Sequence, residues 1–133
     1  MTKEEVESKL DEFEKAVETF KIVLHFDDAN DIEKDASIKR FEYCYESSWK
    51  TIKMFIEYKG GKEIKGSRDS FKEAYRFGLI SGEKLWFDMM EDRNLTVHVY
   101  DMLTAHGIFN HLKPYCLAMI DLIENMKDQL KYD

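Results

Sequence analysis

The fold class follows from one segment near the N-terminus, residues 2–24, which reads TKEEVESKLDEFEKAVETFKIVL. Thr2 and Glu5 have the T-x-x-E spacing of a capping box, a pattern that begins helices. Apolar residues then recur at steps of three and four, at Val6, Leu10, Phe13, Val17, Phe20 and Leu24. This spacing places them on one face of a helix, with glutamates and lysines on the other. The segment therefore predicts an amphipathic helix, which fades near His25 and Phe26.

A second and longer helix is predicted directly after this one. Residues 27–31 form a polar connection that supplies an N-cap. Apolar and aromatic side chains then repeat at helical spacing from about Ile32 to Tyr58, on a face wide enough for burial on more than one side. Gly60 and Gly61 end this helix, because glycine readily adopts the left-handed conformation found at helix ends.

Two shorter helices are predicted in the middle of the chain. Ser67 or Asp69 caps the first of them, and Gly78 closes it. Ser81 caps the second, which presents leucine, tryptophan and methionine to the core and runs into Arg93.

The last predicted helix covers about residues 102–131, and Pro114 within it predicts a bend or a turn. The chain has only one proline and six glycines in 133 residues, which leaves little turn material for a many-stranded sheet. We therefore predict an all-α, up-and-down helical bundle of about five helices, with residues 1–133 forming a single domain.

Composition excludes several classes of protein. The chain is 44% apolar and 35% charged, as in globular rather than disordered proteins. No apolar run approaches the roughly 18 residues of a membrane span, and the N-terminus is too polar for a signal peptide. These features predict a cytoplasmic protein.

Cysteine and histidine spacings indicate neither a disulfide framework nor a metal site. Cys44 and Cys116 stand alone, which predicts two buried, reduced thiols. His25, His106 and His111 lack the spacing of zinc-binding motifs. We therefore expect no metal and no cofactor.

Charge is unevenly distributed in a chain whose net charge is −7. Between residues 50 and 76 basic side chains outnumber the acidic ones, and they are Lys50, Lys53, Lys59, Lys62, Lys65, Arg68, Lys72 and Arg76. Such a segment is either an anion-binding face or a solvated surface whose charges pair with acidic neighbours. On the first interpretation, Lys62, Lys65 and Arg68 contact RNA or a protein partner.

Residues 92–101, with the sequence DRNLTVHVYD, concentrate the reactive side chains. Arg93 and His98 are five residues apart, so a straight helix would point them roughly 140° away from each other. Either the helix breaks between them or they meet through a second copy of the chain. The β-branched residues here favour a helix end or kink.

The chemistry of these two side chains fits metal-independent RNA cleavage. A histidine takes the proton from a 2′-hydroxyl that attacks the adjacent phosphorus, and an arginine stabilises the charge on the phosphate. On residue types alone, caps and ion pairs at a helix end are the simpler explanation.

Several short motifs occur in an order that resembles a known family. They are Arg40-Phe41-Glu42-Tyr43, Trp49-Lys50-Thr51, Ser67-Arg68-Asp69, Gly78-Leu79-Ile80, and Asp92-Arg93-Asn94-Leu95-Thr96 with His98 and Tyr100. The chain resembles the HEPN family, in the branch called nucleotidyltransferase substrate-binding proteins or HepT-like toxins. The resemblance implies a helical bundle that dimerises through the helices carrying R-x4-H-x-Y, so that two Arg/His pairs share one cleft.

The resemblance also implies roles for individual residues. Arg93 and His98 would be the ribonuclease residues, with Asn94 as a supporting polar residue. Tyr100 would be the tyrosine that a partner nucleotidyltransferase modifies with AMP to silence the toxin. Val97 and Val99 stand where relatives usually carry hydroxyl residues, a difference that bears on substrate contacts and on modification of the tyrosine.

Three functional hypotheses follow from the sequence. The first is a HepT-like ribonuclease toxin of a toxin–antitoxin module, acting on RNA and neutralised by a small nucleotidyltransferase antitoxin. The alternative is a non-catalytic substrate-binding subunit of a two-component nucleotidyltransferase. The third is a structural helical dimer in which Arg93 and His98 stabilise the interface. The chain lacks the G-S-x…D-x-D carboxylate signature of a nucleotidyltransferase, so it is not the transferring subunit.

Overall fold

The computed structural model describes residues 1–24 and 28–133, and it confirms the all-α prediction. Its elements are α1 (Lys3–Val23), α2 (Asp31–Tyr58), α3 (Ser67–Arg76), α4 (Lys84–Leu95), the 3-10 helix η1 (Thr96–His98) and α5 (Met102–Leu130). No strand occurs among these described residues. The predicted fading of the first helix near His25 and Phe26 lies outside the described residues, and α1 ends at Val23 with Leu24 as its C-cap.

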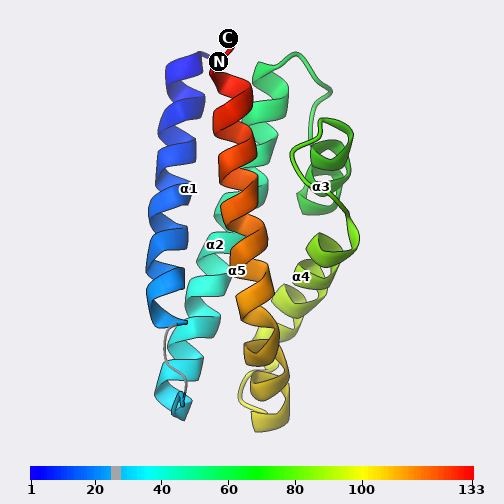
Figure 1. Cartoon of the computed structure of the whole chain (residues 1–133). Coiled ribbons are helices and arrows are strands. Elements are labelled where there is room, and N and C mark those ends of the chain that lie inside the picture. Colours follow the sequence, from blue (N-terminus) through cyan, green and yellow to red (C-terminus); the bar gives the residue numbers. More distant parts are fainter. Residues whose placement is uncertain (25–27) are drawn as a thin grey trace.

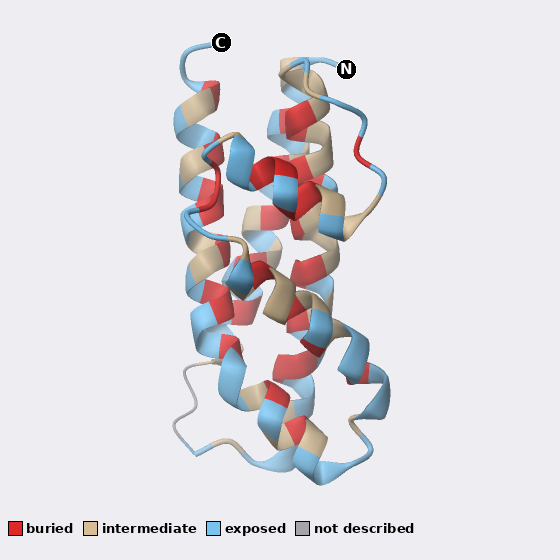
Figure 2. Ribbon diagram, turned by 90° about the vertical axis from the view of Figure 1, so that its right-hand side faces the viewer, coloured by how far each residue is buried: buried red, intermediate tan, exposed pale blue. Residues whose placement is uncertain are grey.

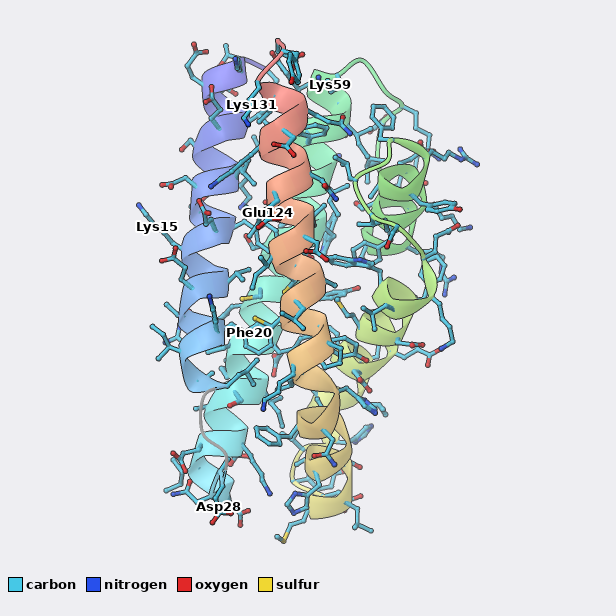
Figure 3. The ribbon with its side chains drawn as sticks, viewed as in Figure 1. Lys15, Phe20, Asp28, Lys59, Glu124 and Lys131 are labelled. Atoms are coloured by element: carbon cyan, nitrogen blue, oxygen red, sulfur yellow. The ribbon has the colours of Figure 1, made fainter. Side chains whose placement is uncertain are left out.

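The long helices α1, α2 and α5 lie side by side, and α3 and α4 pack against one side of them (Figure 1). The chain descends through α1, rises through α2, returns through the short helices and rises again through α5. Both termini therefore lie at one end, where Lys59 Nζ pairs with Asp133 Oδ1 at 2.8 Å (Figure 3). The opposite end holds the starts of α2 and α5 together with η1, so residues 93–103 lie far from the termini.

The core forms where the apolar faces of the helices meet (Figure 2). In α1 the predicted apolar stripe is buried from Val6 to Phe20. Phe41 of α2 packs near the centre, with its ring centroid 6.3 Å from that of Phe20 and 5.5 Å from that of Tyr115. Burial of each such aromatic side chain contributes about 1.5–3 kcal/mol to folding.

Helix starts follow the sequence prediction in the two long N-terminal helices. Thr2 Oγ1 accepts a hydrogen bond from the Glu5 amide at 3.2 Å. Asn30 caps α2 in a complete capping box, in which its side chain accepts from the Glu33 amide and the Glu33 side chain accepts from the Asn30 amide. These bonds satisfy amides that have no partner within the helix.

The predicted caps of the two short helices are wrong. Gly66 is the N-cap of α3 and has no side chain that could accept a bond. The Asp69 carboxylate accepts from the Lys65 amide, 3.2 Å away, outside the helix. Ser81 lies outside α4, which begins at Lys84. The two residues before Ser81, Leu79 and Ile80, are buried in the core, and this packing holds the backbone in a connection of turns and bends.

Helix ends agree better with the sequence. Gly60 and Gly78 have φ values of 83° and 72°, the left-handed conformation expected after α2 and α3. In α5 the helix continues through Pro114, so the predicted turn does not form. Pro114 is exposed, and water can therefore reach the carbonyl group that the missing amide leaves without a partner.

Candidate functional site

Arg93 occupies the last turn of α4, and its neighbours satisfy only part of the hydrogen-bonding capacity of its guanidinium group. Its Nη1 donates to Thr96 Oγ1 at 3.1 Å, and Thr96 Oγ1 donates to the Arg93 carbonyl at 2.7 Å. Its Nε lies 3.6 Å from Glu46 Oε1 of α2, close enough for an ion pair but too far for a hydrogen bond. Arg93 Nε is therefore buried without a hydrogen-bond partner among the described residues.

The helix breaks just beyond Arg93, as the β-branched residues predicted. α4 ends at Leu95, and η1 carries the chain to His98. His98 is exposed, and its Nδ1 lies 3.1 Å from the Tyr100 hydroxyl. The two rings meet edge to face, with centroids 5.8 Å apart. A histidine with one nitrogen near a hydroxyl and the other open to solvent is well placed for proton transfer.

The break does not join Arg93 and His98 by a hydrogen bond within this chain. Arg93 is bonded to Thr96, and His98 is bonded to Tyr100, with no hydrogen bond between the two groups. Asn94 is exposed on the same turn. A single copy thus separates the predicted pair, and an active site that uses both residues requires either movement or a second copy.

Exposed apolar side chains surround this segment. They are Leu95, Val97, Tyr100, Met102 and Leu103, and Leu103 is 81% exposed. A cluster of this kind on a monomer marks an interaction surface more often than chance exposure.

A buried carboxylate immediately before Arg93 was missed by the sequence analysis. Asp92 is only 7% exposed, and its Oδ2 accepts from the Tyr115 hydroxyl at 2.6 Å and lies 2.8 Å from His111 Nδ1. Burial and the bond to Asp92 raise the pKa of Tyr115, so this phenol stays a neutral donor. The two bonds tie the end of α4 to α5 and hold the turn from which Arg93 projects.

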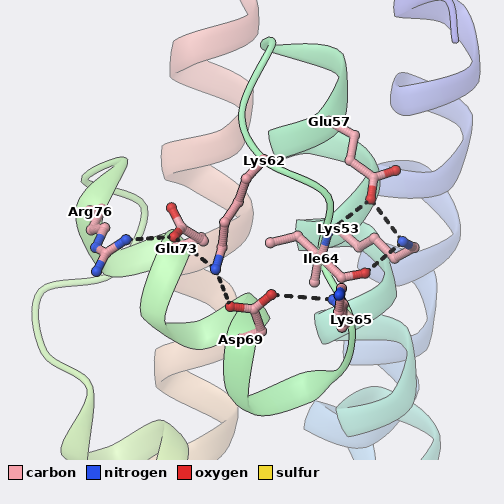
Figure 4. A network of polar contacts seen from close by, with 8 residues as sticks. All are labelled: Lys53, Glu57, Lys62, Ile64, Lys65, Asp69, Glu73 and Arg76. Atoms are coloured by element: carbon pink, nitrogen blue, oxygen red, sulfur yellow. Dashed lines mark hydrogen bonds and ion pairs between the residues drawn. The ribbon is translucent and has the colours of Figure 1, made fainter.

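The basic segment is largely paired with acidic side chains of its own (Figure 4). Lys62 Nζ lies 2.7 Å from Asp69 Oδ1 and 3.6 Å from Glu73 Oε1. The hydrogen bond with Asp69 raises the pKa of Lys62, and the same bond lowers the pKa of Asp69. Lys53 bonds to the carboxylate of Glu57 in the same way, at 2.7 Å. For these lysines the structure favours the solvated, paired surface over an open anion-binding face.

Arg68 and Lys65 differ from Lys62 in their surroundings. The guanidinium of Arg68 lies 5.1 Å from the ring centroid of Phe87 in α4. Lys65 is exposed. Arg68 therefore packs against α4, the helix that also carries Arg93.

Both cysteines are free and buried, as predicted. Burial raises the pKa of the Cys44 thiol to about 12 and also raises the pKa of Cys116, which makes both thiols unreactive in the folded protein. No group of three metal-binding side chains gathers anywhere in residues 1–24 and 28–133. None of the helices in these two ranges is long and apolar enough to cross a membrane.

Comparison with known proteins places this geometry in a family. The family described as "Nucleotidyltransferase substrate binding protein like" matches residues 6–128. The chain belongs to this family. Its helical fold, its R-x4-H-x-Y segment and its motif order agree with that membership, which confirms the HEPN and HepT-like resemblance found in the sequence.

Two relatives are similar to this chain over most of its length. A Haemophilus influenzae protein described as "Probable ribonuclease HepT" is 29% identical over 101 residues, which cover 73% of this chain and 69% of the relative. A crystal structure of a Thermus thermophilus protein superposes with a TM-score of 0.78 at 33% identity, covering 89% of this chain and 98% of the other.

A second solved structure shares the fold of the chain. It comes from Haemophilus influenzae and is described as the substrate binding domain of a nucleotidyltransferase. Its TM-score is 0.68 at 24% identity, and the match covers 92% of this chain and 96% of that one.

Proposed function

We propose that this protein is a HepT-like, metal-independent ribonuclease and the toxin of a toxin–antitoxin pair. The observation that carries the proposal is a partly unsatisfied guanidinium, on Arg93, and an exposed histidine, His98, on either side of a helix break. The likeness to a probable ribonuclease HepT supports the same reaction. A location in the cytoplasm, where RNA is available, belongs to the proposal.

The proposed reaction needs one base and one cation. His98 accepts the proton of a ribose 2′-hydroxyl, and the oxygen attacks the neighbouring phosphorus as the bond to the 5′-oxygen breaks. The products are a 2′,3′-cyclic phosphate and a 5′-hydroxyl, which takes up a proton. Arg93 offers N–H groups to the phosphate oxygens on which negative charge grows.

A second copy of the chain would complete the site. No hydrogen bond joins Arg93 and His98 within one chain, and exposed apolar side chains lie around them. Dimerisation through that surface would bury apolar area and bring arginines and histidines of two copies to one cleft. Asn94, exposed on the same turn, would face that cleft and bind the substrate.

Tyr100 fits the proposed role as the regulatory acceptor. It is 80% exposed, and its hydroxyl lies 3.1 Å from His98 Nδ1. AMP attached to this oxygen by a partner nucleotidyltransferase would set a charged phosphodiester beside the catalytic base. The modification would thereby block both RNA and proton transfer.

Cleavage of a labelled single-stranded RNA by the purified protein tests the catalytic part. We expect cleavage in the presence of EDTA and a loss of roughly 10²–10⁴-fold in His98→Ala, the range typical of a general base. Arg93→Ala should also be inactive, whereas His106→Ala is the matched histidine control and should keep activity. Intact RNA with the wild-type protein, or undiminished cleavage by His98→Ala, would refute the proposal.

Expression without the partner and incorporation of labelled AMP test the biological part. The wild-type protein should arrest growth, and the cognate transferase should relieve the arrest while labelling the protein. Tyr100→Phe should lose the label, and Tyr132→Phe, which removes another highly exposed tyrosine, should keep it. An unchanged label in Tyr100→Phe would exclude Tyr100 as the acceptor.

The non-catalytic substrate-binding subunit is the second candidate. It is favoured by the family description, "Nucleotidyltransferase substrate binding protein like". On that alternative the protein alone leaves RNA intact and does not arrest growth, and its addition raises the activity of the partner transferase. The RNA cleavage assay therefore separates the two candidates.

A further inference from the structure

One exposed face of α2 carries an aromatic ring flanked by two cations. Tyr43 is 52% exposed. Lys39 Nζ lies 5.3 Å from the centroid of its ring, and the Arg40 guanidinium carbon lies 5.8 Å from it. We call these three residues the Tyr43 platform. Its cations are not fully committed to acids, since the ion pair formed by Lys39, with Glu42 Oε2, is long at 3.9 Å.

The Tyr43 platform lies beside the proposed catalytic arginine. Glu46 is one helical turn further along α2, on the same face as Tyr43 by its three-residue spacing, and its carboxylate is 3.6 Å from Arg93 Nε. Three residues of α-helix advance by about 4.5 Å, so Tyr43 lies one turn along α2 from the residue that faces Arg93.

Packing within the chain does not account for an aromatic residue at this position. The buried residues of α2 are on its other faces, and Phe41, two residues before Tyr43, fills the core. Tyr75, another half-exposed tyrosine, has no cation over its ring among the described contacts. Among the residues that the structure describes, Tyr43 has the one ring with two cations near it.

From this arrangement we infer that the Tyr43 platform binds a nucleotide of single-stranded RNA adjacent to the cleaved step. The inference rests on the proposed ribonuclease function and names the residues that hold the substrate. A base stacks on the ring of Tyr43, while Lys39 and Arg40 move from the ring to the phosphates on either side. Stacking accepts any base, so the platform provides affinity and register without base specificity.

RNA binding by the catalytically disabled protein tests the inference. In a His98→Ala background, the affinity for a labelled single-stranded RNA is measured by fluorescence anisotropy. Tyr43→Ala should weaken binding by roughly 5- to 100-fold, the range for one stacked base, and Tyr43→Phe should retain it. Tyr75→Ala is the matched control and should bind as the background protein does.

The salt dependence of RNA binding distinguishes the contribution of the two cations from that of the Tyr43 ring. Lys39→Gln and Arg40→Gln should each reduce the slope of log affinity against log salt by about one phosphate contact, and Tyr43→Ala should leave the slope unchanged. The control is Lys15→Gln, because Lys15 points into solvent from the far side of α1 (Figure 3). Equal slopes in all variants would overturn the assignment of phosphates to Lys39 and Arg40.

Cleavage kinetics on the active protein distinguish failure of this inference from failure of the proposed function. Tyr43→Ala should raise KM with little change in kcat, because the platform holds substrate and transition state alike. If the wild-type protein cleaves RNA and Tyr43→Ala changes neither KM nor affinity, the inference about the Tyr43 platform is wrong and the proposed ribonuclease function is unaffected. If the wild-type protein neither binds nor cleaves RNA, both fail. A change in oligomeric mass with unchanged RNA affinity would assign the ring to a contact between copies and overturn the inference.

Discussion

Removal of the Asp92 carboxylate should destabilise the protein through the tyrosine that it leaves behind. Asp92 Oδ2 accepts from the Tyr115 hydroxyl at 2.6 Å and lies 2.8 Å from His111 Nδ1. Tyr115 is only 3% exposed, so in Asp92→Ala its hydroxyl loses its acceptor in a largely buried position. A buried donor left without a partner costs about 1–3 kcal/mol. The His111 side chain is 56% exposed and can be rehydrated, so it adds little to the loss.

The expected total for Asp92→Ala is a loss of about 1–3 kcal/mol in the free energy of unfolding. For a chain of this length that loss corresponds to a fall of about 4–11 °C in Tm. Urea denaturation followed by circular dichroism measures it, at one fixed protein concentration because dimerisation would add to stability. Asp88→Ala is the control, since Asp88 forms a solvent-exposed ion pair with Lys84 at 3.0 Å. This substitution should lower the free energy of unfolding by less than about 0.5 kcal/mol.

A double-mutant cycle decides whether the buried hydroxyl is the cause. Once Tyr115→Phe has removed that hydroxyl, Asp92→Ala should cost about 1–2 kcal/mol less than it does in the wild-type protein. Additive losses, or a loss below about 0.5 kcal/mol in Asp92→Ala alone, would refute the reasoning.

Three further predictions concern single residues. Gly78 has a φ of 72°, so Gly78→Ala should cost about 1–2 kcal/mol of stability, measured by urea denaturation, whereas Gly82→Ala, at a site with open space and no positive φ, should cost less. Burial raises the pKa of Cys44 to about 12, and a thiol reagent at pH 8 should therefore label it at the rate of unfolding; fast labelling of the folded protein would contradict this burial. The hydrogen bond from Lys53 lowers the pKa of Glu57 below its ordinary 4.5, so its contribution to stability is present above that pH and is lost as the pH falls through the lowered value. Glu57→Gln should flatten the acid limb of a stability–pH curve, and an unchanged limb would count against the Lys53–Glu57 pair.

Long helices could be predicted from the sequence because their signals are local. The apolar repeat of α2 predicted residues 32–58, and the helix covers Asp31–Tyr58. In α5 the predicted residues 102–131 compare with Met102–Leu130. A period near 3.6 sustained over many residues leaves few alternatives.

The starts of the short helices could not be predicted in this way. Ser67 and Ser81 are both good N-cap residues, and neither is used as a cap. The Asp69 carboxylate is instead occupied by Lys62 and by the Lys65 amide, and the Ser70 hydroxyl donates to the Trp49 carbonyl. Such contacts between elements override the local propensity for N-capping, because they satisfy the polar side chains that could otherwise cap the helix.

The proposed site likewise has features that the sequence predicts and features that only the structure reveals. By itself the sequence determined the helical class, the break after Arg93 and the identity of the reactive side chains, because periodicity and residue chemistry are local properties. Only the tertiary structure decided that Asp92 is a buried acceptor for two side chains of α5, that Glu46 faces Arg93, and that Lys62 is neutralised by Asp69 and Glu73. Apart from the short Lys62–Asp69 step, these partners are far apart along the chain, and no spacing rule connects them. Packing of the helices brings them together, since each buried polar group must find a partner wherever the fold places one.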